Sequence, residues 1–230
     1  SRENTKIERT VSAISGDKQG RVWIAVETQG LFCYEPQKDR LYNYTLHEFS
    51  ANVQSIAFDN SGTIWVGFYG LFYSKDNLKT LHPYLSPKDG NEVFKNDVIM
   101  KIVIGAYNCI YISSIRKGVQ ELNLTSGNLR NLLLMDETGE KVYSRDLLVN
   151  SDNELWIGTE SGVYVYNLRT DKYMHLYSSK DDPYSLSDNA IYSLCEDRES
   201  GIWVGSYFGG VDYYPRSYTY FEKYYPKDGD

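Results

Sequence analysis

Asp197–Val211, with the sequence DRESGIWVGSYFGGV, decides the fold, because related versions of it occur five times in the 230-residue chain. In each version a turn leads into a short apolar run, a loop follows, and a glycine and an aliphatic residue open another run. The other versions are Asp17–Leu31, Asp59–Leu71, Gly105–Val119 and Asn150–Val163. Their anchor residues are Trp23, Trp65, Tyr111, Trp156 and Trp203, spaced 42, 46, 45 and 47 residues apart. Self-similarity at this period predicts a propeller or a solenoid.

Each repeat contains signals for four short strands. The residue nine positions before the anchor is aliphatic in all five copies: Ile14, Ile56, Ile102, Leu147 and Leu194. Aliphatic residues on both sides of the anchor predict a second strand with neither face in solvent. A glycine opens a third strand, and a fourth run is rich in aromatic residues: Leu41–Tyr44, Leu81–Tyr84, Tyr173–Tyr177 and Tyr220–Tyr225. The third copy has Leu129–Met135 in place of such a run.

Four short antiparallel strands in about 45 residues are typical of one blade of a β-propeller. The sequence therefore predicts an all-β chain, a single propeller segment over residues 1–230, with repeats at about 11–52, 53–97, 98–142, 143–189 and 190–230. No segment has a sustained helical period, so we expect almost no helix. Closing a five-bladed ring would need Lys6–Thr10 to complete a blade, and this segment resembles a strand only weakly. An open ring, or one completed by a partner, remains an alternative.

Composition argues against several classes of partner. The net charge is −7, and no more than two basic residues occur in a row, which is unlike a surface that binds nucleic acid. No apolar run approaches the ~20 residues that span a bilayer, so we expect membrane contact only through segments outside this chain. The three cysteines fall at different repeat positions and form neither a disulfide nor a zinc pattern; we expect them to be small buried residues. We expect no metal and no cofactor.

Ile191–Val211 resembles the two-component regulator propeller repeat, through Ile-x-Ser-Leu-x-Glu-Asp and Gly-x-Trp-Val-Gly-Ser. The fourth copy agrees over Leu155–Thr159, and the linker Asp181–Asn189 is similar to that family's inter-blade linker. In that family such repeats build the periplasmic sensor region of hybrid two-component histidine kinases, which detect breakdown products of complex glycans. Its members usually have more than five repeats, in seven-bladed rings.

The resemblance implies a periplasmic, non-catalytic sensing segment with an oligosaccharide ligand. It also implies further propeller blades or a second protomer as partners. The alternative function is a scaffold propeller that binds protein, which should carry an apolar patch at its mouth and bind no glycan.

Loops between the second and third strands should cluster at one mouth of the propeller, and binding residues concentrate in such loops. Aromatic faces together with charged hydrogen-bonding groups suit a sugar or a peptide. The candidate ligand-binding residues are Tyr69, Arg116, Glu160, Tyr207 and Phe208. The simpler alternative is that the three aromatic residues only close the tops of their blades.

A catalytic function has less support from the sequence. The turns Asp17/Gly20 and Asp59/Gly62 resemble the Asp box of sialidase propellers, but that box has one residue fewer between Asp and Gly. Of the three arginines that a sialidase needs, only Arg116 and Arg145 lie at plausible positions. A lyase or hydrolase would need an acid–base pair, for which the mouth offers Glu27 and Glu160. Because the sialidase pattern is incomplete and an acid–base pair would rest on these two carboxylates alone, we predict no catalytic residues in this segment.

The three histidines, His47, His82 and His175, lie in or beside the fourth runs, where an outward-facing position is expected. Lys101 and Asp146 occupy the same first-strand position in adjacent copies. This placement favours an ion pair between two blades over a contact to ligand.

Overall fold

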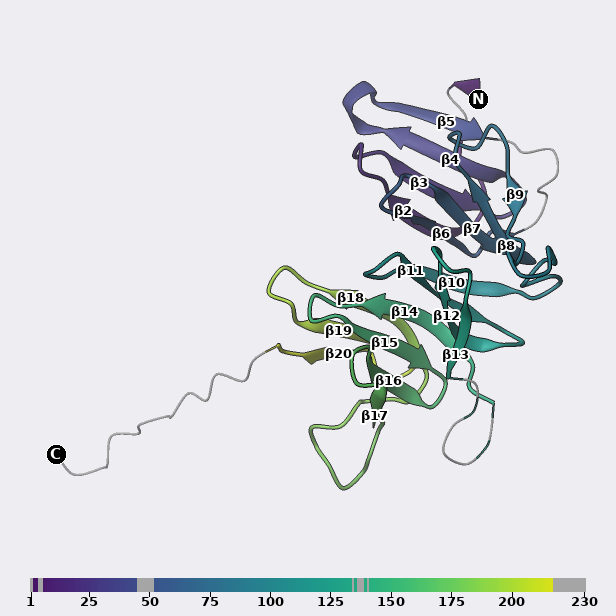
Figure 1. Ribbon diagram of the computed structural model, residues 1–230. Helices are drawn as coiled ribbons and strands as arrows, with labels where there is room; N and C mark the ends of the chain where they lie inside the picture. The colour runs from purple at the N-terminus through teal and green to yellow at the C-terminus, as the bar shows by residue number, and fades with distance from the viewer. Residues whose placement is uncertain are drawn as a thin grey trace, which may run out of the picture.

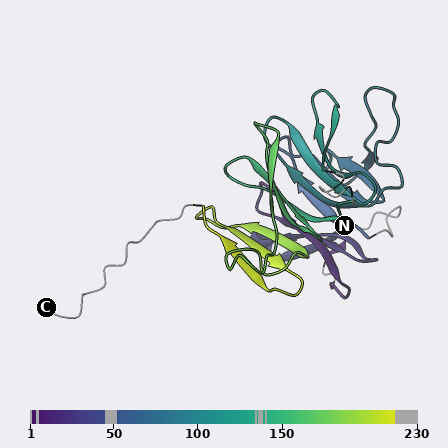
Figure 2. The ribbon, with the colours of Figure 1, turned by 90° about the horizontal axis from the view of Figure 1, so that it is seen from below.

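The computed structural model describes residues 2–3, 6–44, 52–133, 135, 139 and 141–216. These residues fold into a β-propeller of five antiparallel sheets, or blades (Figure 1). Within each blade the main strands pair in chain order. The only helix in this part of the chain is the three-residue 3-10 turn η1 (Pro36–Lys38). The predicted all-β propeller is confirmed, and Figure 2 shows the blades following one another from purple to yellow.

The strands have the following bounds. Blade 1 contains β2 (Val11–Gly16), β3 (Val22–Val26), β4 (Gly30–Glu35) and β5 (Arg40–Tyr44). Blade 2 contains β6 (Ser55–Phe58), β7 (Ile64–Phe68), β8 (Gly70–Ser74) and β9 (His82–Pro83). Blade 3 contains β10 (Ile99–Ile104), β11 (Cys109–Ser114), β12 (Gly118–Asn123) and β13 (Leu129–Leu133). Blade 4 contains β14 (Ser144–Val149), β15 (Glu154–Thr159), β16 (Gly162–Asn167) and β17 (Lys172–Leu176). Blade 5 contains β18 (Ile191–Glu196), β19 (Ile202–Ser206) and β20 (Val211–Tyr214).

The two ends of the chain add detail to this pattern. The short strand β1 (Arg2–Glu3) pairs with β5 at the outer edge of blade 1. Lys6–Thr10, the segment that ring closure would require, contains no strand. The fourth strand predicted for blade 5, Tyr220–Tyr225, lies outside the described residues.

The hydrophobic core lies between the blades. Four clusters of buried side chains fill the four interfaces between successive blades. The anchors of the first four blades contribute one residue to each cluster: Trp23, Trp65, Tyr111 and Trp156. Every residue of β7 is buried, as predicted for a second strand covered on both faces. A Cβ on Gly67 would lie only 2.5 Å from the side chain of Ile99 in the next blade, so this glycine permits the close approach of the two sheets.

An aspartate six residues before the tryptophan holds the anchor in three blades. The indole Nε1 atoms of Trp23, Trp65 and Trp203 donate to an aspartate Oδ2 at 2.8, 3.0 and 3.0 Å. Their acceptors are Asp17, Asp59 and Asp197. The other oxygen, Oδ1, accepts two backbone N–H groups of the same turn in each case. The aspartate of the Asp-x-x-Gly turn therefore has a structural role, and its likeness to a sialidase Asp box carries no catalytic meaning.

Blades 3 and 4 lack this aspartate. Gly105 takes its place in blade 3, where a Cβ would lie 2.4 Å from the ring of Tyr111. Asn150 takes its place in blade 4, where the buried Nε1 of Trp156 has no hydrogen-bond partner among the described residues. The asparagine is engaged elsewhere, because its Oδ1 accepts from Glu154 N and its Nδ2 donates to Glu154 Oε2.

Polar contacts tie blade 3 to its neighbours. Lys101 Nζ lies 2.7 Å from Asp146 Oδ1, which confirms the predicted ion pair between blades 3 and 4. Asp146 Oδ2 also accepts the backbone N–H of Leu194 in blade 5 at 2.8 Å. Ser55 plays the corresponding part in blade 2, where its Oγ accepts from Ile102 N of blade 3 at 2.9 Å. One first-strand side chain thus satisfies an amide of the following blade.

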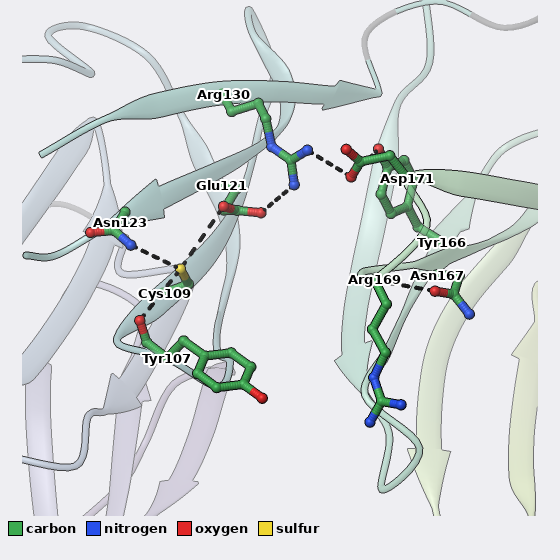
Figure 3. A network of polar contacts seen from close by, with 9 residues as sticks. All are labelled: Tyr107, Cys109, Glu121, Asn123, Arg130, Tyr166, Asn167, Arg169 and Asp171. Carbon is green, nitrogen blue, oxygen red and sulfur yellow. Dashed lines mark hydrogen bonds and ion pairs between the residues drawn. The ribbon is translucent and has the colours of Figure 1, made fainter. Parts of the chain in front are cut away.

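A second network joins the outer strands of blades 3 and 4 (Figure 3). Arg130 of β13 donates to Glu121 Oε2 in its own blade and to Asp171 Oδ1 in the β16–β17 turn, both at 2.7 Å. The hydrogen bonds from Glu121 and then Asp171 raise the pKa of Arg130 above its ordinary value. Arg130 thus links blades 3 and 4 from β13, the fourth strand of blade 3, which lacks the aromatic residues of the other fourth strands.

The cysteines agree with their prediction in two cases of three. Cys33 and Cys109 are buried, and burial raises the pKa of Cys33 to about 11. Cys195 is exposed, so the expectation of a buried residue is wrong there. The reason is that no other blade among the described residues covers this face of blade 5.

Candidate functional site

The mouth of the propeller is the edge at which each first strand begins and each second strand turns into the third. Antiparallel pairing brings these two points together in every blade. The loops predicted to carry the binding residues therefore lie beside the first residues of β2, β10, β14 and β18.

A β-bulge occurs at the second residue of the first strand in four blades. The pairing of β10 with β11, for example, passes from Ile99 directly to Lys101. The residues at the four bulges are Ser12, Met100, Arg145 and Tyr192. A bulged residue is left out of the hydrogen-bond ladder and its side chain is re-aimed, which is a common device beside binding sites.

Two of the bulged residues organise a group of side chains that we call the mouth cluster: Arg145, Glu160, Tyr192, Tyr207 and Phe208. Arg145 Nε donates to Glu160 Oε1 at 2.7 Å. The arginine guanidinium also lies 5.2 Å from the ring centroid of Tyr192, a cation–π contact. The ring of Tyr192 is 5.4 Å from that of Tyr207, whose ring meets Phe208 edge-on at 4.5 Å.

A cavity of about 270 Å³ adjoins the mouth cluster between blades 3 and 4. Its lining residues are Met100, Ser114, Ile115, Tyr143, Ser144, Arg145 and Glu160. This volume lies just below the usual range of small-molecule sites, so it suits one ring or one side chain of a larger ligand. The rest of such a ligand would lie across the exposed aromatic rings.

The structure brings together three of the five predicted site residues. Glu160, Tyr207 and Phe208 belong to the mouth cluster, and Phe208 is 84% exposed. Arg116 and Tyr69 are exposed on the corresponding loops of blades 3 and 2, and the contacts of the described residues do not connect them to the cluster. A ligand-binding role for all five stays a prediction.

Sequence reasoning missed Tyr192 as a site residue and considered Arg145 only as a sialidase arginine. The signal was present in the repeat, because Met100, Arg145 and Tyr192 all stand eleven residues before their anchors. This position varies in size and charge while its neighbour twelve residues before the anchor is aliphatic in four copies. Variation beside a constant packing residue indicates a side chain that points away from the core.

The structure places the remaining carboxylates and histidines considered in the sequence as follows. Glu160 is ion-paired with Arg145, and Glu27 has its backbone N–H bonded to Thr10. His82 is exposed, as expected, and His47 lies outside the described residues. His175, expected to face outward, instead stacks on the ring of Tyr164 at 4.0 Å and contacts Ser161 O. Among the described residues, no group of three or more histidine, cysteine, aspartate or glutamate side chains could hold a metal ion.

Two larger grooves lie away from the mouth cluster. One, of about 500 Å³, follows the Asp59 turn between blades 2 and 3. The other, of about 530 Å³, lies between β17, the following linker and β20, and its wall includes Tyr177, Tyr184 and Tyr213. We favour the mouth cluster as the site because it combines a charged pair with exposed rings, and because two of its residues, Arg145 and Tyr192, stand at β-bulges. The second groove is the competing location.

Comparison with known proteins identifies the repeat. The model of the two-component regulator propeller family matches residues 185–208, which include β18, β19 and the first residues of the mouth loop of blade 5. The chain carries a two-component regulator propeller repeat. The resemblance predicted from Ile191–Val211 is thus confirmed.

The chain is also similar to parts of longer proteins whose names refer to signalling systems. A protein named histidine kinase P4 from Formosa agariphila is 24% identical over 194 residues, which cover 78% of this chain and 14% of the kinase. The extracellular domain of a protein assigned as a one-component system of B. thetaiotaomicron superposes with a TM-score of 0.73. The two are 20% identical, and the match covers 92% of this chain and 28% of that one.

A second structure, the extracellular domain of a protein assigned as a hybrid two-component system of the same organism, has a TM-score of 0.68 and 20% identity. That match covers 90% of this chain and 27% of the other. The chain therefore spans less than a third of the length of these relatives. No helix among its described residues is long and apolar enough to cross a membrane.

Proposed function

We propose that this chain is the ligand-recognising propeller of a bacterial two-component sensor, that it works outside the cytoplasm, in the periplasm, and that its ligand is an oligosaccharide. Relatives that are extracellular domains of one-component and hybrid two-component systems support the setting. The proposal that the chain binds a ligand rests on the mouth cluster.

The chemistry of the mouth cluster suits a sugar. Tyr192, Tyr207 and Phe208 offer exposed ring faces on which the apolar face of a pyranose can stack. Arg145 offers hydrogen-bond donors and Glu160 offers acceptors, and the 2.7 Å hydrogen bond from Arg145 Nε to Glu160 Oε1 already holds both side chains in place. Binding a ring hydroxyl would therefore cost little further conformational entropy in these two side chains. Binding would bias the packing of propellers or protomers between two arrangements that a membrane helix reports.

A thermal-shift screen against a panel of oligosaccharides tests this function. A ligand that binds only the native state raises the melting midpoint by mass action. We expect at least one oligosaccharide to raise it, and we expect Tyr192→Ala and Arg145→Gln to abolish this rise. Both side chains are exposed, so these variants should melt near the wild-type temperature without ligand.

Two further variants locate the site. Tyr107→Asn changes an exposed residue on the opposite edge of blade 3, at a left-handed position that asparagine tolerates, and should keep the full shift. Tyr184→Ala tests the competing groove. Loss of the shift in Tyr184→Ala with retention in Tyr192→Ala would move the site to that groove. Absence of a shift with every oligosaccharide would contradict the proposal for this chain.

The alternative function is a scaffold that binds protein, and one observation favours it. The mouth exposes a run of large apolar side chains, which is the patch expected of a scaffold: Ile115, Tyr143, Tyr192, Tyr207 and Phe208. Binding of a purified extracytoplasmic domain of the same signalling system, lost in Tyr207→Ala and unaffected by any sugar, would support this function.

A further inference from the structure

The groove of about 500 Å³ between blades 2 and 3 has the features of a second binding site, and we call it the Trp65 groove. Its lining includes Trp65, Tyr73, Lys75, His82, Tyr84 and Asn108. All of its lining residues lie between positions 59 and 124, in two blades whose four strands are described. It opens where β6 turns into β7 and β10 into β11, at the edge opposite the mouth. Its volume is within the usual range of small-molecule sites.

Three aromatic rings form one wall of the Trp65 groove. The ring centroids of Tyr73 and Tyr84 lie 5.6 and 5.9 Å from that of Trp65. The indole nitrogen of Trp65 donates to Asp59, whereas the hydroxyls of Tyr73 and Tyr84 have no hydrogen-bond partner among the described residues. Burial raises the pKa of Tyr84, so its hydroxyl keeps its proton at neutral pH. The wall therefore offers ring surface together with two hydroxyl groups that can bind a ligand.

Lys75 brings a positive charge to the Trp65 groove. Its Nζ lies 5.8 Å from the ring centroid of Tyr73, a cation–π contact. Within the part of the chain that the structure describes, Lys75 forms no ion pair. Asp59 is the carboxylate of the lining, but it is only 6% exposed, and its oxygens accept hydrogen bonds from its own turn and from Trp65. The groove therefore holds a cation whose counter-ion is not supplied by the described residues.

The corresponding corner between blades 3 and 4 contains its own counter-ion. There Arg130 donates to Asp171, which the following blade supplies. In strand pairing His82 occupies the repeat position of Arg130. Gly127 occupies the position of Asp171, because each donates its backbone N–H to the asparagine four residues earlier. Pro87 packs against Gly127. At this corner blade 3 thus offers no carboxylate to the cation of blade 2.

We propose that the Trp65 groove binds a small ligand in which a six-membered ring carries a carboxylate. The ring lies against Tyr73 and Tyr84, and the carboxylate pairs with Lys75. A hydrogen bond between two charged groups is stronger than one between neutral groups, so the carboxylate decides which rings are bound. This site is separate from the mouth cluster, and the proposal does not depend on an oligosaccharide binding there.

Titration of the chain with small acids, followed by the NMR signals of the ligand, tests the proposal. The probes are benzoate and glucuronate, and their neutral counterparts are benzamide and glucose. We expect at least one acid to bind, and its neutral counterpart to bind about tenfold more weakly. Binding of benzoate alone would assign an aromatic ring to the ligand, and binding of glucuronate alone a sugar ring. Added salt should weaken binding of the acid but not of the neutral counterpart, because salt screens the charge of Lys75.

Three variants locate the bound acid. Lys75→Gln removes the charge of an exposed side chain, and should bind the acid as weakly as its neutral counterpart. Lys79→Gln makes the same change at an exposed position of the same turn that does not line the groove, so it should bind like the wild type. Tyr84→Leu removes part of the ring wall and should weaken acid and neutral counterpart alike. A melting curve checks that Tyr84→Leu is folded.

Three results would overturn the proposal. The first is that neither acid binds the wild type. The second is a neutral counterpart that binds as tightly as the acid. The third is a Lys75→Gln variant that binds the acid as tightly as the wild type does. If Arg145→Gln abolishes binding in that last case, the acid occupies the mouth cluster and not the Trp65 groove.

Discussion

Asp59 Oδ2 accepts a 3.0 Å hydrogen bond from the indole Nε1 of Trp65, six residues further along the chain. The aspartate closes its own turn with Oδ1 and fixes the anchor ring with Oδ2, so one side chain links the local turn to the core between blades. Asn150 cannot do this for Trp156, because both ends of its amide are bonded to Glu154.

Restoring the aspartate in blade 4 should stabilise the protein. The double variant Asn150→Asp/Glu154→Thr copies the Asp59/Thr63 pair of blade 2 and supplies an acceptor for the indole of Trp156. We expect the free energy of unfolding to rise by about 1 kcal/mol, the usual range for satisfying a buried donor. Asn150→Asp alone should gain less, because the new carboxylate would lie beside Glu154. Urea unfolding curves measure both, and a double variant less stable than the single one would contradict this account.

Acid should destabilise the propeller through these aspartates. Burial alone would raise the pKa of Asp59, but hydrogen bonds from Ser61 and Trp65 outweigh it, and the pKa lies below its ordinary value. The hydrogen bond from Trp203 likewise lowers the pKa of Asp197. A carboxyl with a lowered pKa contributes stability above its unfolded pKa of about 3.9 and loses it as pH falls through the folded value.

The free energy of unfolding should therefore be nearly constant from neutral pH to about pH 5 as far as these groups are concerned, and should fall below about pH 4. Denaturant unfolding at a series of pH values measures it. In Asp59→Asn the stability should be lower at neutral pH and the acid decline shallower. Parallel profiles for variant and wild type would show that Asp59 is not one of the titrating groups.

Gly67 should tolerate no side chain. A methyl group there would lie 2.5 Å from Ile99 Cγ2, and the contact is with a stiff β-branched residue in a packed interface. We expect Gly67→Ala to lower the free energy of unfolding by about 1–3 kcal/mol through overpacking. Gly16→Ala is the control, because nothing lies within 4 Å of its added Cβ and its φ is not positive. Equal effects of the two substitutions on chemical unfolding would argue against close contact of blades 2 and 3.

Asp146 should matter more than its ion-pair partner. Asp146→Ala removes the partner of Lys101 and also leaves the buried amide of Leu194 without its acceptor. We expect a loss of about 1–3 kcal/mol. Lys101→Met leaves that hydrogen bond in place and removes only a partly exposed ion pair, so its cost should stay below about 1 kcal/mol. Thermal or urea unfolding of both variants checks the order, and a larger loss in Lys101→Met would reverse the interpretation.

Much of the fold could be predicted because each position of the repeat occurs in five copies that can be compared with one another. Ile56, Ile102, Leu147 and Leu194 share one position, and such repetition separates packing residues from variable ones without any other sequence. Lys101 and Asp146 could be paired for the same reason, since equal repeat positions in adjacent blades lie side by side. The fourth copy shows the limit of this reasoning: Asn150 reads as a conservative replacement for aspartate, and only its contacts to Glu154 show that the indole of Trp156 loses its acceptor.

The sequence by itself determined the blade, the order of its strands and the interfaces between blades, because these depend on short-range alternation and on a period that recurs along the chain. The mouth cluster and the exposure of Trp203 among the described residues were decided by the tertiary structure. Arg145 contacts Tyr192 and Glu160, which lie 47 and 15 residues further along the chain, because strand pairing and the packing of blades 4 and 5 bring these positions together. Trp203 looks like every other anchor in the sequence, yet it is exposed, because burial of an anchor requires a neighbouring blade and cannot be read from the anchor's own residues.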